Sequence, residues 1–304
     1  MRVKDWGTGA PDDLGNLQMA APLQTYAAGE SLYEFLARQL EALQAEGVLE
    51  VARPKGTPPP PPFSQWAFAQ PHYLQYLTDL YTVHSALESS LQQASNSIES
   101  YSTSGSGTNE SVAQLVVHML GPHQELARSQ AIKSDIASIL STSTSSSSTK
   151  ENNNFTVLPQ VPQEGQEMET ETEDETASPN AAAYAQRLRR LGTQCTQSED
   201  EQEFVSNCLK LAAHVYVVTL TLLTAGARVG AAATEKMNLF ARNAVAVFQE
   251  YPELAEDSAL KVFRKNVDAL GKELSVEEQD VVLRELPIAM RSTAVLLHAL
   301  AKEM

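Results

Sequence analysis

The segment that decides the fold is Leu211-Ala-Ala-His-Val-Tyr-Val-Val-Thr-Leu-Thr-Leu-Leu-Thr-Ala-Gly-Ala227, which carries no charged residue and is followed by Arg228. Such a run invites comparison with a membrane span, which needs about 20 consecutive apolar residues. The segment is shorter than that, and His214 and several threonines dilute its apolar character. We therefore predict that it forms a buried central helix of a globular protein, with no membrane span.

Two glycines, Gly226 and Gly230, lie in the last part of this helical pattern. A glycine in a helix interior costs roughly 1 kcal/mol relative to alanine, so its presence needs a structural benefit. Glycine lets another group approach the backbone closely, and that group is either a bound ligand or a neighbouring part of the protein. The sequence alone leaves both explanations open.

The rest of the chain also shows helical periodicity. The patterns Ser31-Leu-Tyr-Glu34 and Ser275-Val-Glu-Glu278 resemble capping boxes, in which a serine and a glutamate satisfy the first amides of a helix. We expect an all-α fold of about eight helices, because apolar residues recur every three to four positions in each segment. The segments are 31–43, 73–87, 111–140, 181–192, 201–250, 256–272 and 276–303.

Three stretches have compositions that do not favour packing. Pro58–Pro62 predicts a stiff extended connector. Residues 102–110 are rich in serine and glycine and predict a flexible loop. Residues 141–179 combine a serine and threonine tract with an acidic run, Glu164–Glu175, and predict a disordered insert. An acidic segment of this kind also suits docking of a basic partner.

Charge and cysteine content narrow the class of protein. The net charge of −16 argues against nucleic acid and anionic membrane surfaces as partners. The only cysteines, Cys195 and Cys208, provide neither a disulfide framework nor a metal-binding spacing, so we expect two buried thiols in a reducing compartment. The first residues, Met1–Trp6, lack the apolar core of a secretory signal, and nearby aspartates are untypical of a transit peptide.

Several fragments follow one another along the chain: Trp66, Tyr73-Leu74-x-x-Leu77-x-Asp79, Leu87-Glu88, Arg128-x-x-x-Ile132-x-x-Asp135-Ile136, Pro179, Tyr184-x-x-x-Leu188-x-x-Leu191, Thr224-Ala-Gly-Ala-Arg-Val229, Glu235-Lys236 and Leu260–Glu278. In this order and spacing they resemble the plant and algal plastid heme oxygenases, in particular the divergent second type that lacks the proximal histidine. The resemblance covers roughly residues 30–300 and implies a single heme-oxygenase-like multi-helical domain over 28–304, after an N-terminal extension over 1–27. It also implies a plastid location.

The resemblance also implies roles for particular residues. Gly226, Ala227 and Gly230 match the distal helix that lies on the porphyrin face, and Arg264 matches the residue that pairs with a propionate. Active members hold the iron with a histidine of the first helix, whereas here Glu41 stands at that position and the first histidine of the chain is His72. Leu223 stands where the family keeps a polar distal side chain, and a leucine can neither donate nor accept a proton.

Three functions remain open at this point. The first is a heme-oxygenase-like protein of tetrapyrrole metabolism that is deficient in heme degradation and able to bind heme, protoporphyrin or a bilin. The second is an active heme oxygenase, using ferredoxin and producing biliverdin, iron and CO, in which His72 or His84 would supply the iron ligand. The third is a helical interaction protein with no ligand. Apart from the iron ligand that the second function would need, no catalytic residue or metal site is assigned.

Overall fold

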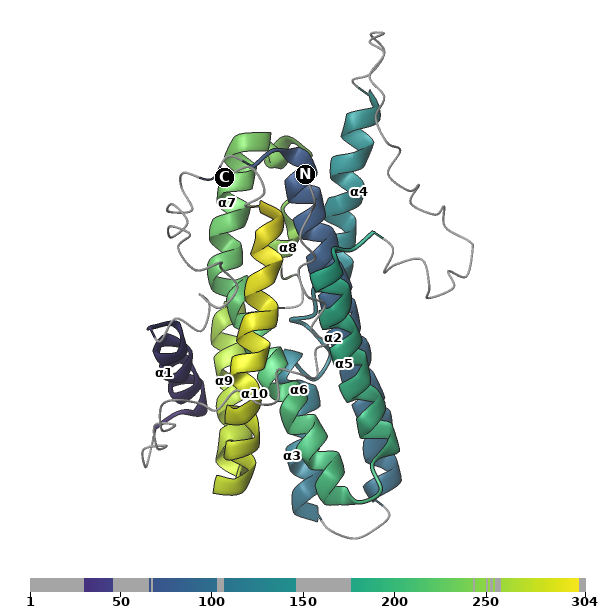
Figure 1. Cartoon of the computed structure of the whole chain (residues 1–304), viewed down its shortest axis with the longest axis vertical. Coiled ribbons are helices and arrows are strands. Elements are labelled where there is room, and N and C mark those ends of the chain that lie inside the picture. The colour runs from purple at the N-terminus through teal and green to yellow at the C-terminus, as the bar shows by residue number, and fades with distance from the viewer. Residues whose placement is uncertain are drawn as a thin grey trace, which may run out of the picture.

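The computed structural model describes residues 30–45, 66, 68–102, 107–145, 176–242, 244–249, 251, 254 and 258–300. Every regular element in these ranges is a helix, which confirms the predicted all-α class. Figure 1 shows their arrangement along one long axis. The elements are α1 (Leu32–Ala45), α2 (Gln70–Ser102), α3 (Gly107–Val117), η4 (His118–Leu120), α4 (Ser129–Ser145), α5 (Pro179–Gln197), α6 (Glu201–Thr221), η5 (Leu222–Gly226), α7 (Ala227–Met237), η6 (Leu239–Arg242), α8 (Ala246–Gln249), α9 (Ala259–Glu273), α10 (Val276–Ala294) and η7 (Val295–Leu300).

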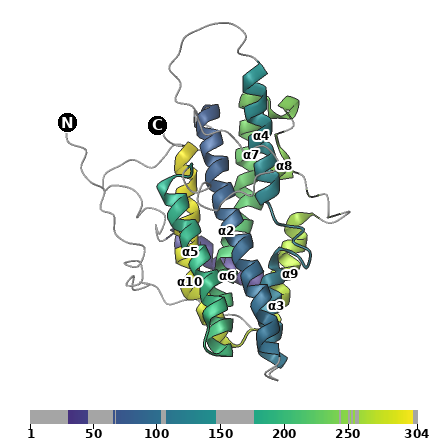
Figure 2. The same ribbon diagram turned by 90° about the vertical axis from the view of Figure 1, so that its right-hand side faces the viewer.

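Helix α6 forms the centre of the bundle, as predicted for the first part of the uncharged run, whereas Thr224 and Ala227 near the end of that run are exposed. Every residue from Leu211 to Thr219 is buried. Helices α5 and α10 pack along α6, and the long helix α2 packs along α5, so the four helices run side by side in Figures 1 and 2. The continuous helical stretch Glu201–Met237 is long and apolar enough to cross a membrane by composition, yet 67% of its most apolar window is buried inside the protein. This burial fits a core helix.

The remaining helices cover the two ends of this core. Helix α6 continues through η5, a π-helical turn, into α7. The short helix α8 packs against both α4 and α7, and Figure 1 shows it between them. At the other end, α1 packs on α9 and α10, and α9 also packs on α3. Helices α4, α7 and α8 therefore lie at one end of the bundle, and α1 and α9 lie toward the other end.

Side-chain caps start four helices, and two of these caps, Ser31 and Ser275, lie where the sequence predicts capping boxes. The hydroxyl of Ser31 accepts a hydrogen bond from the Glu34 amide at 3.1 Å, at the beginning of α1. Ser275 and Glu278 form a complete capping box at the beginning of α10. Ser178 and Ser258 cap α5 and α9 in the same way, because each side chain accepts a hydrogen bond from the backbone amide three residues later. These bonds satisfy amides that have no partner within the helix.

Two predicted helical segments are interrupted because the backbone turns left-handed. The segment 111–140 is divided between α3 and α4 by a turn in which Gly121 has φ 94° and Gln124 has φ 58°. The segment 201–250 stops at Asn238, which has φ 52° and ends α7. Asparagine and glycine adopt this conformation more readily than other residues, but periodicity alone does not reveal where they do so.

The helices extend into the segments that the sequence predicts to be a loop and a disordered insert. Helix α2 continues to Ser102 and α3 begins at Gly107, so both helices enter the predicted loop 102–110. Helix α4 extends to Ser145, and α5 begins at Pro179, at the end of the predicted insert 141–179. Serine and threonine tolerate a helical backbone when a helix already leads into them. The extension 1–27, the proline run and the acidic run lie outside the described residues.

Candidate functional site

The two glycines of the central segment lie against an aromatic ring of the protein itself. Gly226 ends the π-helical turn and Gly230 lies one turn further along in α7, and both are buried. A Cβ placed on Gly226 would lie 3.0 Å from Cε1 of Phe248, and one on Gly230 would lie 2.5 Å from Cδ2 of the same ring. A real side chain does not fit at 2.5 Å. The absence of side chains at these positions therefore makes room for Phe248.

Two buried side chains of the α4 segment hold the short helix that carries Phe248. The Asp135 carboxylate, fully buried, accepts hydrogen bonds from the amides of Ala246 and Val247, each at 3.0 Å. The Arg128 guanidinium donates to the carbonyl of Ala246 and lies 4.1 Å from the centre of the Tyr251 ring. An acidic acceptor at the start of a helix satisfies amides that have no helical partner. This clamp fixes α8 and positions the ring over the glycines.

The backbone of Arg128 is held as well. Glu88 of α2 accepts hydrogen bonds from the amides of Arg128 and Ser129, at 2.8 and 3.0 Å, and from the Ser129 hydroxyl. Glu88 thus caps the beginning of α4 and links it to α2. The clamp on α8 is in this way connected to the longest helix of the bundle.

Of the other residues predicted for the site, Leu223 and Ala227 lie on the same helix as the glycines, whereas Glu41 and Arg264 lie on α1 and α9. Leu223 is half-buried in the π-helical turn, Ala227 is exposed, and Glu41 is exposed on α1. Arg264 lies on the exposed side of α9, where it pairs with Glu34 of α1 and contacts the ring of Tyr33. Arg228 is exposed too. Leu223, Gly226, Ala227 and Gly230 thus share one helix, whereas Arg264 bridges α1 and α9.

The two histidines considered as iron ligands differ sharply in environment. His72 lies at the beginning of α2, where its Nδ1 accepts a hydrogen bond from the Ala69 amide at 3.3 Å. His84 is buried in the middle of α2, and its Nε2 has no hydrogen-bond partner. Burial, and secondarily the positive charge of Arg128, lower the pKa of His84 to about 3. The imidazole of His84 is therefore neutral at physiological pH.

Sequence reasoning did not identify a buried polar network that joins α5, α6 and α10. The Tyr184 hydroxyl lies 2.9 Å from Nδ1 of His214 and 3.4 Å from the Thr293 hydroxyl, and Nε2 of His214 lies 2.9 Å from Oε1 of Glu285. Arg187 donates to the same carboxylate oxygen through Nε at 3.2 Å and Nη2 at 2.6 Å. The only sequence signal was His214 itself, a polar residue within an otherwise apolar run.

The network has a consistent pattern of donors and acceptors. Burial lowers the pKa of His214 and outweighs the hydrogen bond with Glu285, so the imidazole is neutral. Burial alone would raise the pKa of Glu285, but its hydrogen bonds and the charge of Arg187 lower it overall, which keeps the carboxylate ionised. An ionised carboxylate only accepts hydrogen bonds, so His214 donates one from Nε2 to Glu285 and accepts one at Nδ1 from the Tyr184 hydroxyl.

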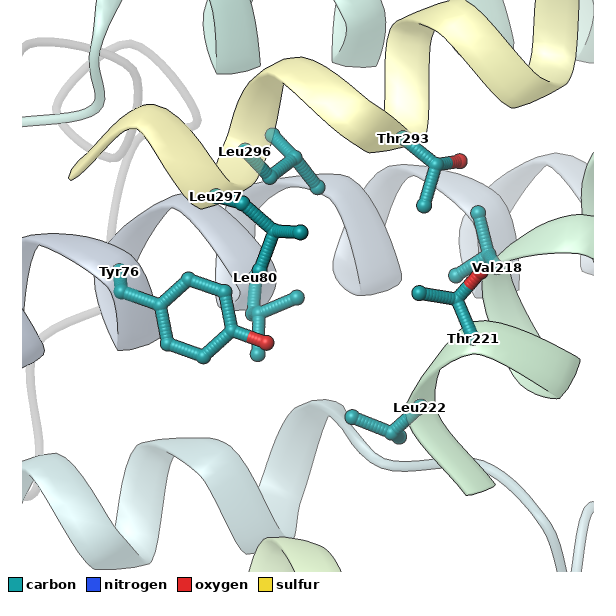
Figure 3. Close-up of a pocket in the computed structure, with 8 residues that line it drawn as sticks. All are labelled: Tyr76, Leu80, Val218, Thr221, Leu222, Thr293, Leu296 and Leu297. Atoms are coloured by element: carbon teal, nitrogen blue, oxygen red, sulfur yellow. The ribbon is translucent and has the colours of Figure 1, made fainter. Parts of the chain in front are cut away.

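A small pocket lies between this network and the π-helical turn. Its volume is about 20 Å³, room for about one water molecule, whereas sites for small organic ligands enclose roughly 300–1,000 Å³. Thr293 belongs both to this pocket and to the polar network, and Leu222 belongs both to the pocket and to the π-helical turn. Figure 3 shows the Tyr76 hydroxyl pointing into the space between the leucines. The lining residues are Tyr76, Leu80, Val218, Thr221, Leu222, Thr293, Leu296 and Leu297.

The contact between Phe248 and the glycines predicts that Gly230→Ala has opposite effects on stability with and without the Phe248 ring. Gly230→Ala is expected to lower the free energy of unfolding by about 1–3 kcal/mol, because the added methyl overpacks the Phe248 ring. In a Phe248→Ala background the same change is expected to be stabilising by up to about 1 kcal/mol, because alanine favours helix and the ring is gone. Urea unfolding of the four proteins measures both effects. Equal effects in the two backgrounds would contradict the contact.

Comparison with known proteins does not assign this chain to a family. No model of a known protein family matches the sequence, and no curated protein sequence matches it. Within the described ranges, no three His, Cys, Asp or Glu side chains lie close enough together to hold a metal ion.

Proposed function

We propose that this chain is a heme-oxygenase-like helical protein that does not degrade heme. The observation that carries the proposal is the ring of Phe248 on Gly226 and Gly230, the two glycines that the resemblance assigns to the tetrapyrrole face. The relation to heme oxygenases rests on the order of the sequence fragments. A role in tetrapyrrole metabolism and a plastid location belong to the same proposal.

A heme does not fit against Gly226 and Gly230 as the described residues are arranged. Phe248 fills the surface over the glycines, and the pocket beside the π-helical turn has a volume of only about 20 Å³. Arg264, the expected propionate partner, instead pairs with Glu34. Heme, protoporphyrin or a bilin would therefore have to displace Phe248 to contact the two glycines.

The side chains needed for heme degradation are also missing from their expected places. Helix α1 contains no histidine, and Glu41 is exposed. A carboxylate oxygen is a poor ligand for ferrous heme compared with a neutral imidazole nitrogen. Leu223 cannot organise the water network that protonates bound oxygen. These changes support a loss of catalysis on both sides of the expected heme plane.

The proposal predicts the outcome of a heme-degradation assay. The full chain, incubated with hemin and either ferredoxin or ascorbate as reductant, is expected to produce no biliverdin above the rate without protein. An active heme oxygenase in the same assay is the positive control. Biliverdin formed by the wild-type chain at a rate comparable to that control would overturn the proposal, and its loss in His84→Ala would then assign the iron ligand to His84.

A hemin titration tests whether Phe248 covers a surface that can bind hemin. Phe248→Ala is expected to bind hemin at least about tenfold more tightly than the wild type, because ligand binding no longer requires about 1.4 kcal/mol or more for moving the ring. Phe240→Ala is the matched control, since Phe240 is 61% exposed. Equal absorbance changes at equal hemin concentrations for all three proteins would exclude Phe248 as the group that covers the surface.

A further inference from the structure

The only two cysteines of the chain lie in contact across the α5–α6 hairpin. Cys195 lies in the last turn of α5 and Cys208 in the first half of α6, and both are fully buried. Their Sγ atoms are 3.9 Å apart. The tight turn between the helices ends at Asp200, whose carboxylate accepts a hydrogen bond from the Glu203 amide at 2.7 Å and fixes the start of α6.

This distance places the two sulfurs in van der Waals contact. A disulfide has an S–S length of about 2.05 Å, and cysteines whose side chains point apart cannot form one without moving the backbone. Here the two thiols already point toward each other, since they are within hydrogen-bonding contact. Closing the remaining gap needs rotation of the two side chains and movement of the adjacent helices toward each other.

We propose that Cys195 and Cys208 form a reversible intramolecular disulfide that staples α5 to α6 when the surroundings become oxidising. The oxidant is a low-molecular-weight disulfide of the glutathione type. One protein thiolate attacks it, forms a mixed disulfide and releases one small thiolate. The second protein thiolate then attacks the protein sulfur of the mixed disulfide and releases the second small thiolate. The two protons of the protein thiols pass to the two released thiolates, so one small disulfide is reduced for each staple formed.

The surroundings of the pair make the staple slow to form and slow to break. The hydrogen bond with Cys195, together with burial, raises the pKa of the Cys208 thiol well above its ordinary value. Because thiolates perform the exchange, the reaction proceeds when the hairpin opens transiently. Native geometry sets the equilibrium position, and opening of the hairpin sets the rate. This inference does not depend on the proposed function.

The test compares disulfide formation in the folded and unfolded chain. The full chain is reduced, unfolded and then refolded in glutathione buffers of graded redox ratio, with parallel samples kept in denaturing urea. Intact mass after thiol blocking reports the disulfide, and its assignment is unambiguous because the chain has only two cysteines. The equilibrium constant for the staple is expected to be roughly 100-fold larger in the folded chain than in urea, as the closure of a loop of this size allows.

Serine variants provide the control and a second readout. Oxidation is expected to raise the urea midpoint of the wild type and to leave the midpoints of Cys195→Ser and Cys208→Ser unchanged. An equilibrium constant in the folded chain that is equal to or below that in urea would overturn the proposal. So would an unchanged wild-type midpoint after complete oxidation, or a disulfide found only between two chains on a non-reducing gel.

Discussion

Acidification from pH 6.5 to pH 5 is expected to weaken the wild-type fold by roughly 2 kcal/mol through His84 alone, at about 1.4 kcal/mol per pH unit. The folded-state pKa of His84 is about 3, below its ordinary value of 6.5. Between these two values the unfolded chain binds a proton at His84 and the folded chain does not. Acid therefore favours unfolding throughout this window, and the loss reaches on the order of 5 kcal/mol as the pH approaches 3.

His84→Leu removes this dependence with little change in size. The variant is expected to be at least as stable as the wild type at pH 7, because leucine also removes a buried ring nitrogen that has no partner. Its loss of stability between pH 7.5 and 5 is expected to be smaller than that of the wild type. His214, whose pKa is also lowered, contributes the same sign in both proteins. Glu285 contributes only below its ordinary value of 4.5, because its pKa is lowered in the fold.

Urea unfolding at half-unit pH steps from 7.5 to 5 measures this difference. His123→Gln serves as the control, because His123 is exposed in the turn between α3 and α4. That variant is expected to keep the wild-type pH dependence. Parallel curves for the wild type and His84→Leu would show that His84 is protonated in the folded chain at pH 5, and would contradict its buried neutral state.

Replacing Asp135 by asparagine is expected to lower the free energy of unfolding by about 2–4 kcal/mol. The two carboxylate oxygens accept hydrogen bonds from the amides of Ala246 and Val247 respectively. An asparagine has only one oxygen, so one buried amide would face another donor. The loss should be concentrated in α8, and amide hydrogen exchange at Ala246 and Val247 should accelerate more than exchange in α6.

Asp280→Asn is a matched control for this substitution. Asp280 pairs with Arg284 on the surface of α10, where both side chains are partly exposed. Exposed pairs of this kind contribute about 0–1 kcal/mol. If Asp135→Asn and Asp280→Asn had equally small effects, the buried clamp on α8 would not hold the helix as described.

Loss of the clamp also bears on the proposed function. Asp135 positions α8, and α8 carries the ring that covers Gly226 and Gly230. Under the proposal, Asp135→Asn should therefore strengthen hemin binding in the same direction as Phe248→Ala. The two variants differ in cause, because one removes the ring and the other loosens the helix that holds it.

The helical fold could be read from the sequence because its signals are local. Apolar spacing predicted the helices, and the Ser-x-x-Glu patterns at Ser31 and Ser275 predicted the beginning of two of them. Ser178 and Ser258 cap two more helices in the same local way, although neither was predicted from the sequence. The helix ends were harder to predict. Gly121, Gln124 and Asn238 turn the backbone left-handed, and an apolar pattern passes through such positions without an obvious break.

The candidate site was only partly readable. The sequence singled out Gly226 and Gly230 but not their partner, because Phe248 lies in a short apolar run that resembles any other core segment. Arg264 has the chemistry of a propionate partner, yet its position beside Glu34 directs it to a surface ion pair. Residue type indicates what a side chain can do, whereas its neighbours decide what it does.

The sequence by itself determined the helical class, the buried central helix and the absence of a histidine from α1, since each depends on composition or on spacing along one segment. Only the tertiary structure decided that Phe248 covers the glycines, that Cys195 meets Cys208, and that His214 joins Tyr184 to Glu285. These contacts join different helices, and two of the His214 partners are 30 and 71 residues away. Packing of the whole bundle fixes such pairs, because helical periodicity specifies which face is buried but not which residue it meets.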